Sequence, residues 1–295
     1  MNDLQSPLLE VKNLKVAFAN ESGDKENQWQ QILHGVSFSV YKGRTLGLVG
    51  ESGCGKSITA LSIMGLLPQP YSKITSGSIV YQNQELTQLP SQQRYQLRGD
   101  RISIIFQDPM TALNPVHTIG QQICEVLALH RPELAKKQRW HHAIELLEKV
   151  QIPNPQLRIR EYPHHLSGGM RQRVMIAMAL ACQPDILICD EPTTALDVTV
   201  QASILDLMHD LQQETQMAMI FITHDLGVVA EICDDVAVMY GGKIVEYSDV
   251  FELFDHPKHP YTKRLLGLMP KLTDKPKQLI DIKPIDTTLF PEFQG

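Results

Sequence analysis

The sequence lacks the features of a membrane-spanning or secreted chain. It has no apolar run near the roughly 18 to 20 residues that a bilayer-spanning helix needs, and its start, MNDLQSPLLEV, has no basic segment followed by an apolar one. Acidic residues outnumber basic ones, 33 against 27, for a net charge of -6. This balance gives no overall attraction to nucleic acid. We therefore expect a peripheral role at any membrane and no nucleic-acid partner.

Cysteine is also scarce. The chain has five cysteines, and no two of them have the C-x-x-C spacing of a redox or zinc motif. We expect reduced thiols and a cytoplasmic compartment. Internal repeats and low-complexity tracts are absent from the sequence, which favours one nucleotide-binding core over two.

What the sequence does contain is a glycine-rich segment, Gly50 to Ser57, that reads GESGCGKS. It follows the apolar run 45–49 and precedes a helix-like segment, 58–67. A strand, a glycine loop and a helix in this order point backbone N–H groups and the helix dipole into a concavity that fits phosphate. We expect Lys56 to reach the β- and γ-phosphates of a nucleotide and the Ser57 hydroxyl to bind Mg²⁺.

The alternative for this segment is a glycine-rich turn with a solvated lysine, but the rest of the chain does not suit it. The loop supplies eight candidate nucleotide contacts: Gly50, Glu51, Ser52, Gly53, Cys54, Gly55, Lys56 and Ser57.

Periodicity predicts two kinds of sheet. Residues 8–18 and 32–41 are rich in β-formers and predict two antiparallel strands joined by a polar surface loop, 19–31. Strands then alternate with helices, which predicts an α/β core with a mostly parallel sheet covered on both faces.

A helical insertion interrupts this α/β pattern. Residues from about 108 to 166 have apolar side chains at three- and four-residue spacing. Gly241-Gly242 predicts a hairpin between short strands. From Pro257 onward the composition predicts a small appendage or a loosely ordered tail.

Paired carboxylates end a buried strand at Asp185 to Glu191, DILICDE. Open α/β sheets place their ligands at this end of the strand. We expect Asp190 to hold Mg²⁺, directly or through water, and Glu191 to polarise the water that attacks the γ-phosphorus. The alternative, an acidic pair that caps a turn, would be favoured only in a chain without a phosphate loop.

A second anion site is predicted at His164 to Arg173, HHLSGGMRQR. A Ser-Gly-Gly turn that opens a helix offers free backbone N–H groups to an anion. One nucleotide uses only one such helix start, so the second needs a separate explanation.

These residues resemble the ATP-binding cassette (ABC) ATPases, a family with a P-loop core, a mixed sheet, an antiparallel β subdomain and an inserted helical subdomain. The resemblance covers residues 8 to 268. Six motifs of the family occur in order, as Walker A, Q-loop, signature, Walker B, D-loop and H-loop: GESGCGKS, Gln107, LSGGM, DILICDE, Ala195-Leu196-Asp197 and His224.

The resemblance explains the surplus anion site, because two cassettes of this family face head to tail and each ATP lies between the Walker A of one and the signature of the other. It implies that Ser167, Gly168 and Gly169 contact the nucleotide in the partner's site. Asp197 would lie at the dimer seam. Phe18 falls where the family places an aromatic, usually tyrosine, that stacks on adenine.

The resemblance also implies the catalytic roles. Gln107 would sense Mg²⁺ and the attacking water, and His224 would hydrogen-bond the γ-phosphate, beside the base Glu191. Seen alone, His224 would more often be a structural histidine at a strand end. The Mg²⁺ set would be Ser57, Gln107 and Asp190. The signature has Met170 in place of the commoner glutamine, which leaves Ser-Gly-Gly intact.

Within the family, three stretches resemble the ATP-binding subunits of bacterial dipeptide, oligopeptide and nickel importers: QDPMTALNP at 107–115, DEPTTALDVTVQ at 190–201 and HPYTKRLLGLM at 259–269. Relatives often continue into a cysteine-bearing tail that can hold an iron–sulfur cluster. The sequence has no cysteine after Cys233, so we expect no cluster. The chain could be naturally short or the first half of a fused two-cassette protein.

The resemblance thus predicts an ATP-binding and hydrolysing subunit that powers peptide import at the cytoplasmic face of the bacterial inner membrane. Its partners would be a second cassette (itself or a paralogue), two permeases and, indirectly, a solute-binding protein. We expect an ABC ATPase domain over 1–260, with a helical subdomain at about 108–167, and a short extension over 261–295. The alternatives are a nickel or other small-solute importer, a non-transport ABC ATPase, or a P-loop kinase, which would leave LSGGM and His224 without a role.

Overall fold

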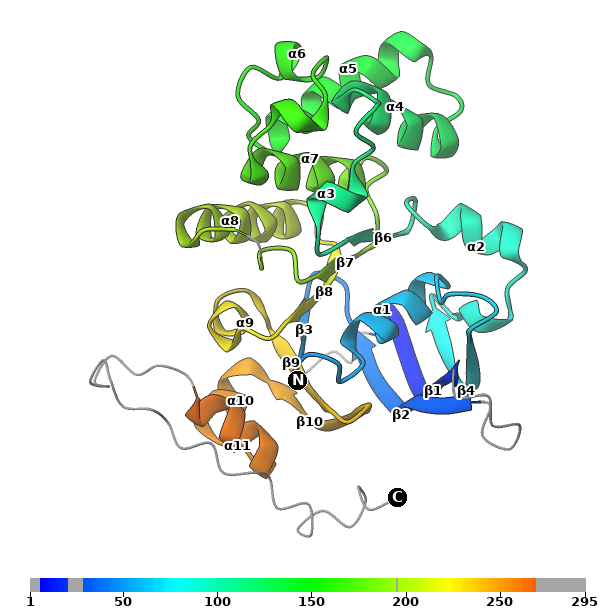
Figure 1. Ribbon diagram of the computed structural model, residues 1–295, viewed down its shortest axis with the longest axis vertical. Coiled ribbons are helices and arrows are strands. Elements are labelled where there is room, and N and C mark those ends of the chain that lie inside the picture. The colour runs from blue at the N-terminus through cyan, green and yellow to red at the C-terminus, as the bar shows by residue number, and fades with distance from the viewer. Residues whose placement is uncertain (1–5, 21–28, 195, 269–295) are drawn as a thin grey trace.

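The computed structural model describes residues 6–20, 29–194 and 196–268 (Figure 1). Most of the predicted extension, 269–295, lies outside the described residues. The described residues form two sheets, with helices packed around them. In the part of the chain that is described, no helix is both long and apolar enough to cross a bilayer.

The smaller sheet is antiparallel, with the order β2-β1-β4-β5. Its strands are β1 (Leu9–Ala19), β2 (Trp29–Val40), β4 (Ser72–Tyr81) and β5 (Gln84–Glu85). The predicted strand pair is present, with Leu9 opposite Val40. The predicted loop over 19–31 was too long, because Ala19 pairs with Trp29 and Ala17 with Gln31. Cross-strand pairing therefore extends into residues whose polarity indicated a loop.

The larger sheet is mixed, with the order β10-β9-β3-β8-β7-β6. Its strands are β3 (Thr45–Val49), β6 (Ile102–Ile105), β7 (Ile186–Asp190), β8 (Ala218–Thr223), β9 (Asp235–Tyr240) and β10 (Lys243–Asp249). Five strands are parallel, and β10 pairs with β9 as an antiparallel hairpin. Every residue of β3 and β8 is buried, as expected for central strands covered on both faces. The predicted fold class is confirmed.

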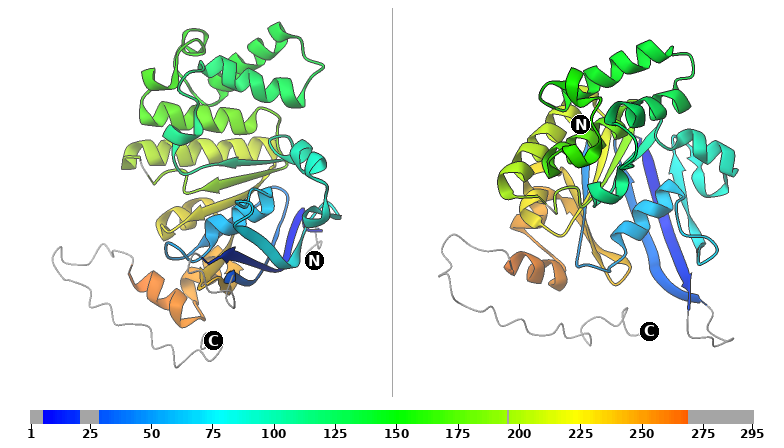
Figure 2. Two further views of the ribbon diagram at one scale, coloured as in Figure 1. Left: turned by 45° about the vertical axis from the view of Figure 1, so that its right-hand side comes forward. Right: turned by 45° about the horizontal axis from the view of Figure 1, so that its top comes forward.

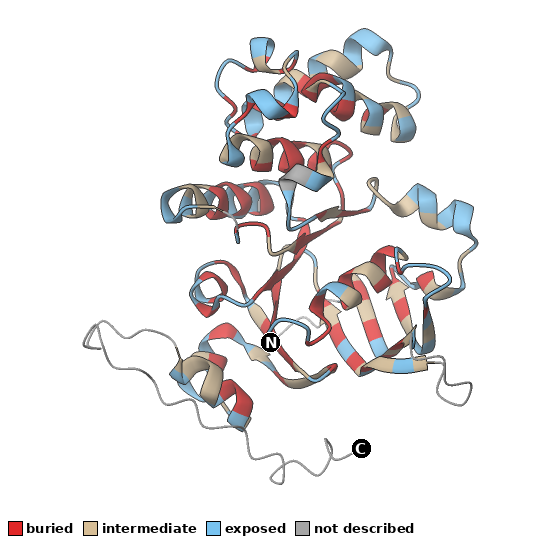
Figure 3. Ribbon diagram, viewed as in Figure 1, coloured by how far each residue is buried: buried red, intermediate tan, exposed pale blue. Residues whose placement is uncertain are grey.

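Different elements cover the two faces of this sheet (Figures 1 and 3). On one face, α1 (Lys56–Met64) and the antiparallel sheet enclose a core with Leu48, Ile188 and Ile222. On the other, α7 (Gly168–Leu180), α8 (Val198–Thr215) and α9 (Leu226–Ile232) pack on Leu187, Phe221 and neighbouring side chains. The sheet thus forms the middle layer, with its carboxyl ends free to carry a site.

A helical layer lies beyond α7, on the side away from the antiparallel sheet (Figure 2). Between β6 and α7 the chain forms α3 (Pro109–Ala112), α4 (Ile119–His130), α5 (Lys136–Lys149), α6 (Pro155–Arg158) and a 3-10 turn, η2 (Pro163–His165). Thr118 and Gln121 form a capping box that starts α4. The four-residue spacing of Ile119, Ile123 and Leu127 puts one apolar stripe of α4 into the core.

The packing of this layer gives a stability prediction. Leu147 on α5 is fully buried, so Leu147→Ala is expected to destabilise the protein by about 2–5 kcal/mol through lost burial and a cavity. Leu157→Ala is the matched control, because Leu157 is 69% exposed and its truncation should change stability by at most about 0.5 kcal/mol. Urea unfolding of both variants measures the difference. Equal midpoints would show that the layer does not pack as described.

Three short helices and a 3-10 turn had no counterpart in the sequence prediction. They are η1 (Leu86–Gln88), α2 (Ser91–Leu97), α10 (Val250–Asp255) and α11 (Pro260–Gly267). Asp249 caps α10 and His259 caps α11. The predicted appendage from Pro257 therefore begins as an ordered helix, and Tyr261 is among the largest fully buried side chains.

Candidate active site

The phosphate loop joins β3 to α1 and is held between the two sheets. A Cβ at Gly50 would lie 2.1 Å from the Met239 carbonyl oxygen, and one at Gly55 would lie 2.5 Å from Leu33. Both glycines have positive φ, so both space and backbone conformation require glycine. Glu51, Ser52 and Gly53 are exposed, whereas the 54–56 segment is buried. The buried part of the loop is thus held in place, while residues 51–53 are exposed to solvent.

Lys56 is buried and turned into this loop. Its Nζ donates to the carbonyl oxygens of Gly50 at 2.8 Å and Glu51 at 2.9 Å. The ammonium group is therefore held in the concavity by two backbone acceptors. A triphosphate that enters the loop would offer this cation stronger, charged acceptors.

Ser57 and Asp190 meet at the carboxyl ends of β3 and β7, with 3.1 Å between the Ser57 Oγ donor and Asp190 Oδ1. Burial raises the pKa of the Asp190 carboxyl, against the opposing hydrogen bond from Ser57. A cation here would favour the ionised form. A hydroxyl and a carboxylate are hard oxygen donors, so this pair fits Mg²⁺.

Glu191 lies at the centre of a second group of polar side chains. Its carboxylate accepts from Gln107 Nε2 at 2.9 Å and from Thr194 Oγ1 at 3.1 Å, and it lies 3.3 Å from His224 Nδ1. Its φ of 48° and the bond from its N–H to the Ile222 carbonyl fix the turn after β7. The structure thus brings together the three predicted catalytic residues. Gln107 lies 84 positions from Glu191 in the sequence, and His224 lies 33 positions from it.

The predicted signature residues lie at the start of α7. Ser167 caps this helix by accepting from the N–H of Met170 at 3.3 Å. A Cβ at Gly169 would lie 2.7 Å from Val200 on α8, the helix whose first turn Asp197 caps. A Cβ at Gly168 would lie 3.9 Å from Leu196. The signature turn therefore lies against Leu196 and the first turn of α8.

Phe18 lies in β1 of the antiparallel sheet. It is half-buried, pairs with Gln30 and Ser72 across the antiparallel sheet, and packs on the core beneath it. Its predicted stacking role therefore stays a prediction.

Sequence reasoning missed two contacts of the site. Thr194, which holds Glu191, could have been found from its position three residues after the carboxylate. Tyr261, 210 residues from Glu51, accepts a hydrogen bond from the Glu51 N–H at 3.0 Å. A signal for it existed only in the HPYT motif, since no local pattern connects the two segments.

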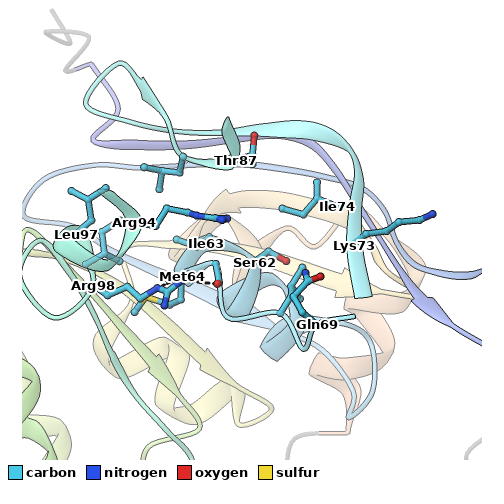
Figure 4. A pocket seen from close by; sticks show the side chains of 14 residues that line it. Ser62, Ile63, Met64, Gln69, Lys73, Ile74, Thr87, Arg94, Leu97 and Arg98 are labelled. Carbon is cyan, nitrogen blue, oxygen red and sulfur yellow. Dashed lines mark hydrogen bonds between the residues drawn. The ribbon is translucent and has the colours of Figure 1, made fainter. Parts of the chain in front are cut away.

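A cavity of about 400 Å³ lies at the other end of α1, between β4 and α2 (Figure 4). Arg98 lines it and donates to the carbonyl oxygens of Met64 and Gly65, at the end of the helix. None of its lining residues belongs to the phosphate loop. It is therefore separate from the candidate nucleotide site.

The chain is similar to peptide-transport subunits over nearly its full length. It is 51% identical over 288 residues to a dipeptide transport ATP-binding protein, DppD, of Bacillus subtilis, covering 98% of this chain and 84% of the relative. It is 52% identical to the oligopeptide transport ATP-binding protein OppD of the same organism, covering 90% and 72%. It is 47% identical to AmiE, an oligopeptide transport ATP-binding protein of Streptococcus pneumoniae, over 100% of this chain and 81% of the relative.

Solved cassettes share the fold. A dimeric ATP-binding cassette in a post-hydrolysis state, bound to ADP and Pi, superposes with a TM-score of 0.71 at 27% identity, covering 82% of this chain and 98% of that one. A cassette of Clostridium perfringens, part of an ABC transporter complex, gives 0.69 at 26% identity, covering 85% and 91%. Residues 33–194, more than half of the chain, match the ABC transporter family. Three observations agree: this match, the high identity to relatives over most of the chain, and the six motifs in order. The chain belongs to the ABC transporter family of ATP-binding cassettes.

Proposed function

We propose that this protein is the ATP-binding and hydrolysing subunit that powers peptide import through a membrane ABC transporter. The observation that supports hydrolysis best is the Gln107–Glu191–His224 group beside the Ser57–Asp190 pair. Peptides are the proposed cargo because the relatives named above carry peptide transport in their names and match almost the whole chain.

In the proposed reaction Glu191 accepts a proton from water as the water oxygen attacks the γ-phosphorus, and the bond to the ADP oxygen breaks. Gln107 and Thr194 donate to one Glu191 oxygen, Oε2, so the carboxylate is oriented before water arrives. His224, 56% exposed at its side chain, faces outward from the other oxygen and would reach the γ-phosphate.

Ser57 and Asp190 would hold Mg²⁺, with Gln107 near it. The ion would neutralise charge on the β- and γ-phosphates when ATP is bound.

The position of the signature residues supports a head-to-tail dimer. Ser167 caps α7, and a Cβ at Gly168 or Gly169 would meet Leu196 or Val200 rather than the loop that follows β3. We infer that they complete the ATP site of a second cassette, either a paralogue or another copy. ATP would then close the dimer and hydrolysis would reopen it.

We further propose the division of the chain and its location. Residues 1–260 would form the ATPase domain, with about 108–167 as a helical subdomain that contacts a membrane-spanning permease, and 261–295 the extension. This chain would lie peripherally at the cytoplasmic face of a bacterial inner membrane. A solute-binding protein would be an indirect partner that delivers peptides to the permeases.

Purification of the intact complex from its native host, through a tag on this chain, tests the transporter assignment. Mass spectrometry is expected to identify two permeases and a second cassette. A matched purification with tagged Lys56→Ala serves as the control for assembly without nucleotide. Recovery of this chain alone or with soluble partners would contradict the transporter role but not the ATPase.

A further inference from the structure

Helix α11 is attached to the large sheet by a buried carboxylate. Glu246 on β10, 9% exposed, accepts hydrogen bonds from the backbone N–H of Lys258 at 2.8 Å and of His259 at 2.9 Å. Burial opposes the charge, but the hydrogen bonds outweigh it and lower the pKa of Glu246. The segment before α11 is therefore held in one place against β10.

This attachment places Tyr261 beneath the phosphate loop. Tyr261 is 1% exposed, and its ring packs on that of Tyr240 with 4.4 Å between centroids. Its hydroxyl oxygen accepts the N–H of Glu51 at 3.0 Å. The Gly242 N–H donates to the Cys54 carbonyl at 3.1 Å, so the β9–β10 hairpin supports the loop beside α11.

Tyr261 and Lys56 both form hydrogen bonds with the peptide group that joins Gly50 to Glu51. The peptide between Gly50 and Glu51 offers its carbonyl oxygen to Lys56 Nζ at 2.8 Å and its N–H to Tyr261 at 3.0 Å. A cation on the carbonyl polarises the peptide and strengthens the N–H donor, so the two bonds support each other. The orientation of this peptide sets where the lysine ammonium is held in the phosphate loop.

We propose that Tyr261 is a positioning residue of the phosphate loop, through which the docking of helix α11 sets the affinity for ATP. The inference rests on the nucleotide binding in the proposed function and assigns a regulatory contact to a segment outside the six motifs. Tyr261 touches no reacting atom and acts through the Gly50–Glu51 peptide. Its loss should therefore weaken nucleotide binding more than it slows the chemical step.

The test compares Tyr261→Phe with the wild type in the full chain. Phenylalanine keeps the ring on Tyr240 and removes only the acceptor. One neutral hydrogen bond corresponds to about a 2- to 12-fold change, so KM for MgATP and the calorimetric Kd for MgADP are expected to rise within that range. The turnover number should change by less than about 2-fold, since the Glu191 group is untouched.

Tyr247→Phe is the matched control. Tyr247 is on β10, 42% exposed, with its hydroxyl 3.5 Å from the Ser39 carbonyl and away from the loop. It should leave KM and Kd unchanged. A purely structural role for Tyr261 would lower the melting temperature without this split between KM and turnover.

Glu246→Gln provides a second, independent variant that keeps the tyrosine. Its amide can accept only one of the two N–H donors, so the α11 segment loosens and KM should rise in the same direction. In the double variant with Tyr261→Phe, Glu246→Gln should raise KM by less than it does alone. Both changes act through the contact between the Tyr261 hydroxyl and the Glu51 N–H.

The outcomes separate the two claims. Equal ATP affinity in wild type, Tyr261→Phe and Glu246→Gln would overturn the role of Tyr261 and leave the ATPase assignment standing. A wild type that binds no MgATP or MgADP would overturn the proposed function, and the inference with it. If Tyr261→Phe fails to fold, an unchanged KM in Glu246→Gln overturns the inference.

Discussion

Replacing Glu191 with glutamine is expected to slow ATP hydrolysis by about 10²- to 10⁴-fold, the usual contribution of a general base, while ATP stays bound. Glutamine has the same shape but cannot take the proton of the attacking water. Gln107 and Thr194 both donate to Glu191 Oε2. The glutamine carbonyl can accept the same bonds, so the turn should keep its form.

Phosphate release measures the rate, and nucleotide retained after gel filtration measures the trapped state. Glu214→Gln is the matched control, because Glu214 forms only an exposed ion pair with Lys149. The control should hydrolyse ATP at the wild-type rate. Near-normal turnover in Glu191→Gln would remove Glu191 from the role of base and direct attention to His224.

Replacing Lys56 with alanine is expected to weaken ATP binding itself. The ammonium group would donate charge-assisted bonds to two phosphates, each contributing about 1.5–3 kcal/mol, so affinity should fall by about 10²-fold or more. The variant also frees the carbonyl oxygens of Gly50 and Glu51, which accept hydrogen bonds from Lys56 in the phosphate loop. The loop should therefore lose part of its fixed form.

Calorimetric titration with MgATP measures this loss, with Lys149→Ala as the control for removing a surface lysine. Lys149 pairs with Glu214 on the protein surface and should not affect nucleotide affinity. The two active-site variants thus differ in kind: Glu191→Gln retains ATP without hydrolysis, and Lys56→Ala does not retain it. ATP affinity in Lys56→Ala equal to that of the wild type would refute the phosphate-loop interpretation.

The sheets and the phosphate loop could be predicted from the sequence because their signals are local. Buried strands appear as short apolar runs, and β3 is followed directly by its glycines and helix. The carboxylates of Asp190 and Glu191 could be placed because a parallel strand delivers its last residues to a known edge. The meeting of Gln107, Glu191 and His224 followed only from the resemblance, since no spacing rule joins positions so far apart.

Other features had no local signal. Helix α2 has no buried residue, so no apolar stripe marks it. Helix α11 begins at Pro260, directly after its cap His259, in a region rich in proline and lysine, and it is ordered by Glu246 from another element. The ends of β1 and β2 extend because their backbones pair with each other, which side-chain polarity does not record.

The position of β3 in the large sheet has a consequence for biosynthesis. Its neighbours are β8 and β9, which begin at Ala218 and Asp235, so both come from a part of the chain made long after Thr45–Val49. On the ribosome, this strand, which is fully buried in the folded protein, leaves the exit tunnel with no partner on either edge, and its phosphate loop with no hairpin beneath it. Such non-local pairing delays folding and exposes aggregation-prone surface. The parallel pairing around β3 therefore forms only after β8 and β9 have been translated, and the phosphate loop gains its supporting hairpin at the same late stage.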